Sequence, residues 1–301
     1  MPVLDAIAQL KKEKKAIILA HYYVEDQVQE IADYIGDSFY LSKVATETDA
    51  EQIIFAGVSF MAESAKILNP EKRVFMPDAR ADCAMAHMVD VARIEKMRSE
   101  VEDLAVVCYI NSTAEIKTYS DVCVTSANAV KIVRELPNKN IFFIPDGNLG
   151  RYVAEQVPEK HVILNDGYCP VHHAMTGDMI KKAKAAHPEA EFVVHPECRQ
   201  EVVEQASYAG STSGIIKYVS SSDKKEFIVG TEVGVFYQLK KENPDKVFYP
   251  VMEPQVCEDM KLVTPEKILD VLQNETNEVF MDDERREKAL IPLKRMLELA
   301  K

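Results

Sequence analysis

The chain has 301 residues, of which 47% are hydrophobic and 28% are charged, so it can form a large core divided over two or three compact units. Its formal charge of −13 at pH 7 argues against a nucleic-acid groove or an anionic membrane surface as its partner. It has no run of about eighteen or more apolar residues, and its first residues lack the order of a signal peptide. We therefore expect a cytoplasmic protein.

Apolar strand-like runs and helical patterns alternate along the chain, and they form three similar series. The first run of each series ends in polar side chains: AIILAHYY at 16–23, AVVCYINS at 105–112 and FVVHPE at 192–197. A Ser or Thr then precedes an amphipathic segment, a buried strand with a helical pattern follows, and a last apolar run closes on a cysteine. This alternation predicts βαβ units, each with a parallel sheet.

Three residue classes recur at spacings of 86 and 88 residues. They are a His or Tyr at the strand end, a Ser or Thr, and a cysteine: His21, Tyr109 and His195; Ser38, Ser126 and Thr212; Cys83, Cys169 and Cys257. A common period in three unrelated residue classes indicates one structural unit present in three copies.

We therefore predict an α/β protein of three three-layer αβα units around a pseudo-threefold axis, at residues 1–86, 87–172 and 173–262. Residues 263–301 are expected to form helices that pack on this core. Ligands of parallel sheets lie beyond the carboxyl ends of the strands. Three such edges that face one axis should therefore enclose a single central cavity.

The cysteines give this cavity a chemistry. None of the six belongs to a C-x-x-C pair, and a reducing cytoplasm disfavours structural disulfides. Cys83, Cys169 and Cys257 follow turn residues and should converge on the axis, where three thiolates suit an iron–sulfur cluster or a zinc ion. Of the other three cysteines, Cys108 and Cys123 are predicted core residues. Cys198 lies at a predicted strand end and is ambiguous.

Long motifs along essentially the whole chain resemble the quinolinate synthases, the iron–sulfur enzymes of NAD biosynthesis. They read AIILAHYY, IADYIGDS, FAGVSFMAESAKILNP, YINSTAEIKTYSDVCVTSANAV, GYCPVH, and HPEC followed by GSTSG. The resemblance implies a [4Fe-4S] cluster on Cys83, Cys169 and Cys257, with one iron free to act on the substrate. It also implies that iminosuccinate condenses with dihydroxyacetone phosphate to give quinolinate, phosphate and water.

Two departures from the family pattern are visible. Tyr22 replaces the usual asparagine of the first motif, and the C-terminal C-x-x-C-x-x-C of some members is missing, as in the short form of the family. The resemblance also implies that aspartate oxidase or aspartate dehydrogenase supplies the iminosuccinate. Two other classes of function remain open: a zinc-dependent lyase or hydrolase that uses the same cysteines, and a non-catalytic iron–sulfur sensor.

Both implied substrates are anionic, although the chain is acidic. Ser38, Ser126 and Thr212 stand at predicted helix starts, where free N–H groups and the helix dipole can hold carboxylate or phosphate. His21 and His195 are candidate donors or proton shuttles.

Glu197 is the expected acid/base, and Tyr23 and Tyr109 are expected to donate hydrogen bonds. The other predicted substrate contacts are Ile110, Asn111, His172 and Pro196. Expected to lie outside the site are His87, His161, His173, His187 and Lys217.

Overall fold

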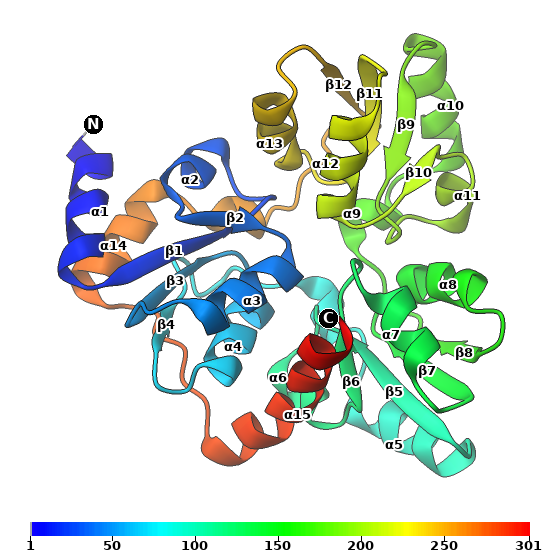
Figure 1. Cartoon of the computed structure of the whole chain (residues 1–301), viewed down its shortest axis with the longest axis horizontal. Coiled ribbons are helices and arrows are strands. Elements are labelled where there is room, and N and C mark those ends of the chain that lie inside the picture. The colour runs from blue at the N-terminus through cyan, green and yellow to red at the C-terminus, as the bar shows by residue number, and fades with distance from the viewer. Residues whose placement is uncertain (1) are drawn as a thin grey trace.

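The computed structural model describes residues 2–301 as an α/β protein whose parallel sheets surround a common centre (Figure 1). Among these residues, the strands form three four-stranded sheets with the orders β2-β1-β3-β4, β6-β5-β7-β8 and β10-β9-β11-β12. All strand pairs in these sheets are parallel. The same strand order recurs three times, which confirms the predicted fold class.

The first sheet is built near the N-terminus. Its central strand β3 reads QIIFA and is buried along its whole length, as expected for an apolar strand covered on both faces. The elements of this part are α1 (Pro2–Glu13), β1 (Ala16–His21), α2 (Asp26–Ile31), β2 (Tyr34–Gly36), α3 (Ser38–Glu47), β3 (Gln52–Ala56), α4 (Ser59–Leu68), β4 (Arg73–Phe75) and the 3₁₀ helix η1 (Ala84–His87).

The second sheet repeats this arrangement. Its strand β5 pairs with β6 and β7, so that Cys108 lies beside Cys123 in the interior of the sheet. The elements are α5 (Val91–Glu100), β5 (Leu104–Tyr109), α6 (Ala114–Thr118), β6 (Val122–Val124), α7 (Ala129–Glu135), β7 (Asn140–Ile144), α8 (Gly147–Gln156), β8 (His161–Leu164) and α9 (Pro170–His173).

The third sheet has hydrophobic clusters of its own. Val193 and Val194, neighbours on β9, belong to two different clusters, because successive side chains of a strand point to opposite faces. The elements are α10 (Gly177–Ala186), β9 (Glu191–Val194), α11 (Gln200–Val203), β10 (Tyr208–Ala209), α12 (Thr212–Ser221), β11 (Glu226–Gly230), α13 (Val235–Glu242), β12 (Val247–Pro250) and the 3₁₀ helix η2 (Met260–Leu262).

Two C-terminal helices, α14 (Pro265–Asn274) and α15 (Asp283–Leu299), pack on the first two sheets and their helices. Helix α14 lies against α1, α2 and β3, whereas α15 lies against α4, α6 and β6 and so bridges the two parts (Figure 1). The Thr264 hydroxyl caps α14 by accepting from the Lys267 N–H. Within residues 2–301, no helix has the length and apolar character needed to cross a membrane.

Candidate active site

A cavity of about 240 Å³ lies where the three sheets meet. His21 ends β1, Tyr109 ends β5 and His195 directly follows β9, and all three side chains line this cavity. The three strand ends that recur every 86 or 88 residues along the sequence therefore meet at the same cavity. This is the location expected for a ligand of parallel sheets.

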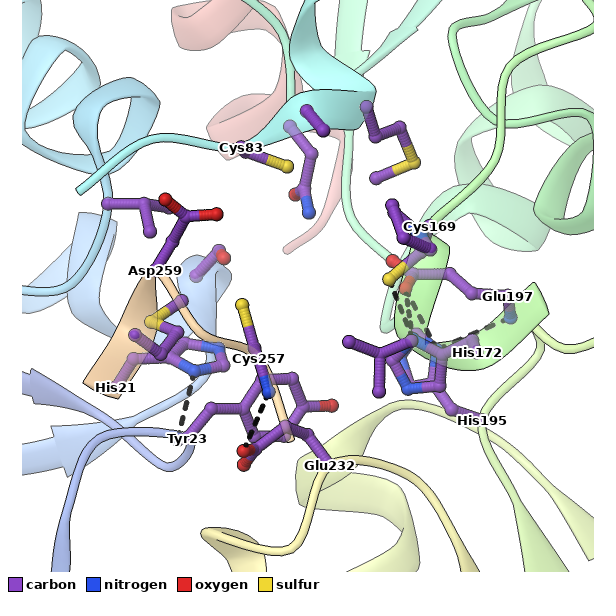
Figure 2. A pocket seen from close by; sticks show the side chains of 18 of the residues that line it. His21, Tyr23, Cys83, Cys169, His172, His195, Glu197, Glu232, Cys257 and Asp259 are labelled. Carbon is purple, nitrogen blue, oxygen red and sulfur yellow. Dashed lines mark hydrogen bonds and ion pairs between the residues drawn. The ribbon is translucent and has the colours of Figure 1, made fainter. Parts of the chain in front are cut away.

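Cys83, Cys169 and Cys257 line the cavity from three directions, and their sulfur atoms point into the same space (Figure 2). A turn of helix follows each of them. The carbonyl of Cys83 accepts from the Ala86 N–H (2.9 Å), that of Cys169 from the His173 N–H (2.8 Å), and that of Cys257 from the Lys261 N–H (3.2 Å). The repeat thus places the three thiols in similar local structure.

Burial makes these thiols poor acids. It raises the pKa of Cys83 to about 12 and that of Cys257 to about 11, and it raises the pKa of Cys169 well above the usual value. The charges of Cys257 and Cys83 also raise the pKa values of Cys83 and Cys169, respectively, so the sulfurs influence one another. A metal centre that replaces the three protons would remove this cost of ionising thiols away from water.

The other three cysteines are fully buried and do not line the cavity within the described chain. Cys108 and Cys123 belong to the large core cluster, where they pack as small apolar side chains. Cys198 belongs to a core cluster of the third sheet, and its thiol donates to the carbonyl of Gly230 (3.6 Å). The sequence left Cys198 ambiguous, and the structure places it in a core.

His21 and His195 have the same local geometry in two of the repeats. Nδ1 of each ring accepts from a backbone N–H two residues later, from Tyr23 (3.2 Å) and Glu197 (3.3 Å), respectively. Burial lowers the pKa of His21 to about 3 and that of His195 to about 4. Both rings are therefore neutral near pH 7, with the proton on Nε2 as a hydrogen-bond donor, and in His195 this nitrogen faces Ser126 Oγ (3.2 Å).

Glu197 is a buried carboxylate held by side chains from two elements. Tyr109 O–H donates to Oε1 (2.6 Å), and Oε2 lies 2.7 Å from His172 Nδ1. Burial alone would raise the pKa of Glu197, but the neighbouring His195 and His172 and the bonds from His172 and Tyr109 hold it below the usual range. Glu197 is therefore ionised and fixed in orientation beside the cavity.

Tyr23 crosses from the first sheet to the third. Its hydroxyl hydrogen-bonds to Thr212 Oγ1 and Thr231 Oγ1, both at 2.7 Å, and burial raises its pKa well above the usual value. Thr231 also contacts His172 Nε2 (2.9 Å). The sequence reasoning missed Thr231, although it directly follows β11 and the rule of strand carboxyl ends points to it.

The three predicted hydroxyl residues line the cavity, but their local structures differ. Ser38 and Thr212 are the first residues of α3 and α12, and the side chains of Asp37 and Ser211 cap these helices. Only the predicted helix start is wrong for Ser126, because α7 begins at Ala129; Ser126 itself contacts His195 Nε2 (3.2 Å). A turn closed by the Thr125 N–H and Asn128 Oδ1 (2.7 Å) delays the start of this helix.

Asn111 and His172 line the cavity as well, and Asn111 Oδ1 is buried with no hydrogen-bond partner in the described chain. Neither Ile110 nor Pro196 is among the described residues that line it. The cavity lining in the described chain also does not include the side chains expected outside the site: His87, His161, His173, His187 and Lys217.

A buried ion pair that the sequence reasoning also missed supports one side of the cavity. Lys261 Nζ lies 3.1 Å from Glu232 Oε1 and donates to the carbonyl of Tyr23 (2.7 Å). Glu232, which lines the cavity, accepts from the backbone N–H groups of Cys257 (3.2 Å) and Gly234 (2.6 Å). The pair therefore joins the loop that carries Cys257 to the turn after β1 that carries Tyr23. Figure 2 shows Glu232 bonded to Cys257 at the edge of the cavity.

We expect Glu232→Gln to lower the free energy of unfolding by about 2 kcal/mol, because hydrogen bonds to a charged group are lost and Lys261 is left unpaired. Urea unfolding of the metal-free chain measures this change. Glu242→Gln, a change on the exposed end of α13, is the matched control and should shift the free energy by less than about 0.5 kcal/mol. Equal stability of the two variants would contradict a supporting role for Glu232.

Comparison with known proteins identifies the family of this chain. The family described as "Quinolinate synthetase A protein" matches residues 5–298. The quinolinate synthase of Fusobacterium nucleatum is 53% identical over 98% of this chain and 99% of its own length. Those of Caldicellulosiruptor bescii and Clostridioides difficile are each 50% identical over 98% of this chain and 97% of their own lengths. The chain therefore belongs to the quinolinate synthase family of enzymes.

Proposed function

We propose that the chain condenses iminosuccinate with dihydroxyacetone phosphate to form quinolinate, with release of phosphate and water. The observation that carries this proposal is the convergence of three thiols and one oriented carboxylate on a single cavity. Membership in the family supports the reaction class. The three cysteine sulfurs support an iron–sulfur cluster at the same place.

Cys83, Cys169 and Cys257 would hold a [4Fe-4S] cluster. Their sulfurs face one space, and their neutral thiols need a metal partner in order to ionise. Within residues 2–301 no fourth cysteine lines the cavity, so three protein thiolates would leave one iron open. When bound, the cluster would supply Lewis-acid chemistry at that iron.

Substrate anions would be bound by local donors, since the chain carries a net charge of −13. His21 and His195 are neutral and can donate from Nε2 to a carboxylate. Helices α3 and α12 begin at the cavity with Ser38 and Thr212, so their N-termini add free N–H groups and a favourable dipole.

Proton transfers would use Glu197, with Tyr23 and Tyr109 as hydrogen-bond donors. The carboxylate is ionised and can take a proton from the condensing carbon, then return it to a departing hydroxyl. The Tyr109 hydroxyl and His172 hold its two oxygens in place, so the orientation is set before the substrate arrives.

The upstream partner would be an enzyme that converts aspartate to its imine, either an oxidase or a dehydrogenase, and we propose a cytoplasmic location for both proteins. Iminosuccinate hydrolyses readily, so the supply has to be generated during the assay. This requirement determines how the function is tested.

The test is quinolinate formation by anaerobically purified chain that carries its cluster. Iminosuccinate is generated in the assay, dihydroxyacetone phosphate is added, and quinolinate is measured by chromatography. We expect product from the cluster-loaded chain and none from the metal-free chain. No product from a sample with full iron and sulfide content would refute the proposed reaction. Zinc without sulfide in the active sample would instead favour a zinc-dependent lyase.

A further inference from the structure

A second metal-binding arrangement lies within the cavity wall. Cys169 Sγ, His172 Nδ1 and Glu197 Oε2 come within 4.8 Å of one another, and all three belong to buried or half-buried residues. We propose that these atoms form a mononuclear Zn²⁺ site in the chain that lacks its cluster. This site uses one of the three cluster cysteines together with two residues that hold no cluster iron.

The outer contacts of the trio are those that an N/O/S zinc site requires. His172 Nε2 lies 2.9 Å from Thr231 Oγ1, which fixes the ring from its far side. Glu197 Oε1 accepts from the Tyr109 hydroxyl (2.6 Å), which leaves Oε2 directed at His172. Metal-bound histidines and carboxylates are commonly held in this way by hydrogen bonds to their other atoms.

The ligand atoms lie close to one another, but at spacings that differ from those of a bound metal ion. In the described chain His172 Nδ1 lies 3.1 Å from Cys169 Sγ and 2.7 Å from Glu197 Oε2, which are hydrogen-bond distances. Ligand atoms of tetrahedral zinc lie about 3.3–3.6 Å apart, given Zn–N, Zn–O and Zn–S bonds of about 2.0–2.3 Å. The two contacts of His172 would therefore open by about half an ångström, whereas Cys169 Sγ and Glu197 Oε2, which lie within 4.8 Å of each other, would approach by up to about 1.3 Å.

Zinc binding balances with the release of one proton. The thiol of Cys169 loses its proton to solvent as sulfur binds the metal. His172 Nδ1, which donates to Glu197 Oε2 in the metal-free chain, binds the metal, and the ring proton moves from Nδ1 to Nε2, where it donates to Thr231 Oγ1. One thiolate, one imidazole and one carboxylate suit Zn²⁺, and three protein ligands leave a fourth position open toward the cavity.

Because Cys169 belongs to both arrangements, zinc and the cluster would exclude each other. Zinc bound to the cluster-free chain would therefore block assembly of the cluster and would also occupy the carboxylate of Glu197. This competition rests on the proposed function, whereas the zinc site itself does not. The two ideas separate experimentally because Cys83 and Cys257 belong to the cluster alone.

Zinc titration of the cluster-free full-length chain, in competition with a chromophoric chelator, tests the site. We expect one Zn²⁺ per chain and unchanged affinity in Cys257→Ala, which loses a cluster ligand. Cys169→Ala and Glu197→Gln should each weaken binding by more than about 100-fold, the upper range for a change to an outer-shell partner. With Co²⁺ as the probe, the sulfur-to-cobalt absorption should vanish in Cys169→Ala and persist in Cys257→Ala.

His172→Asn and His173→Asn form a matched pair of adjacent residues. The first should lose tight zinc binding, whereas the second should retain it, since His173 contacts Asn148 outside the trio. Circular dichroism of each variant shows whether the chain is folded, and Glu197→Gln provides the same test without changing side-chain size. Equal loss of zinc in Cys257→Ala and Cys169→Ala would overturn the proposal, because the three cysteines would then hold the metal. So would the absence of stoichiometric zinc binding to the folded chain.

Discussion

Cys169→Ala is expected to abolish cluster binding and, with it, all measurable quinolinate formation. Cys169 begins the turn of helix α9, and its sulfur shares the cavity with those of Cys83 and Cys257. The two remaining thiolates, those of Cys83 and Cys257, cannot hold a cluster that needs three protein ligands. The measurement is iron and sulfide content per chain after anaerobic reconstitution, followed by the quinolinate assay.

Two other cysteines provide the controls for this variant. Cys108→Ala and Cys198→Ala each remove a buried thiol from a hydrophobic cluster away from the cavity. Each should cost about 1–2 kcal/mol of stability through lost packing, while iron content and activity remain. Normal iron in Cys169→Ala would count against the three-cysteine assignment, and loss of iron in either control would show that the wrong thiols had been chosen.

Glu197→Gln is expected to lower kcat by about 10²–10⁴-fold, the usual contribution of a positioned acid or base. The amide keeps the size of the side chain and can still accept from the Tyr109 hydroxyl, but it cannot take up a proton. KM should change much less, because the neutral histidines and the helix N-termini that would bind the substrates are unchanged. Steady-state kinetics of the cluster-loaded variant measure both constants.

The matched control is Glu204→Gln, an exposed position just after α11 that leaves the cavity untouched. Its kcat and iron content should equal those of the unchanged chain. Iron content also has to remain normal in Glu197→Gln, since no cluster ligand is removed. A Glu197→Gln enzyme with full activity would exclude the carboxylate as the acid/base and would point to a tyrosine instead.

The cavity lies at the interface between the first two sheets and the third sheet, which have separate hydrophobic cores. The first two sheets share one hydrophobic cluster with α14 and α15, whereas the third sheet has its own clusters. Polar contacts cross from the first sheet to the third, such as Tyr23 to Thr212 and the Ser213 hydroxyl to Asp37. Buried polar side chains are tolerated at this interface because they form hydrogen bonds with one another.

Much of the architecture could be predicted from the sequence. Apolar runs at 16–23, 105–112 and 192–197 form central strands, because a parallel strand covered on both faces needs an uninterrupted apolar segment. The repeated spacing of the cysteines predicted that Cys83, Cys169 and Cys257 would face one cavity. These features depend on local pattern and on repetition, and both can be read along the chain.

The contacts between repeats were settled only in the tertiary structure. Lys261 and Glu232 are 29 positions apart and Tyr109 and Glu197 are 88 apart, and no local pattern predicts such pairs. The ring-proton positions of His21 and His195 likewise depend on a turn in which Nδ1 accepts a backbone N–H. The sequence alone determined three parallel sheets and the thiols at their junction. Folding decided which polar groups touch across it, because desolvation and hydrogen-bond geometry act between atoms brought together only by packing.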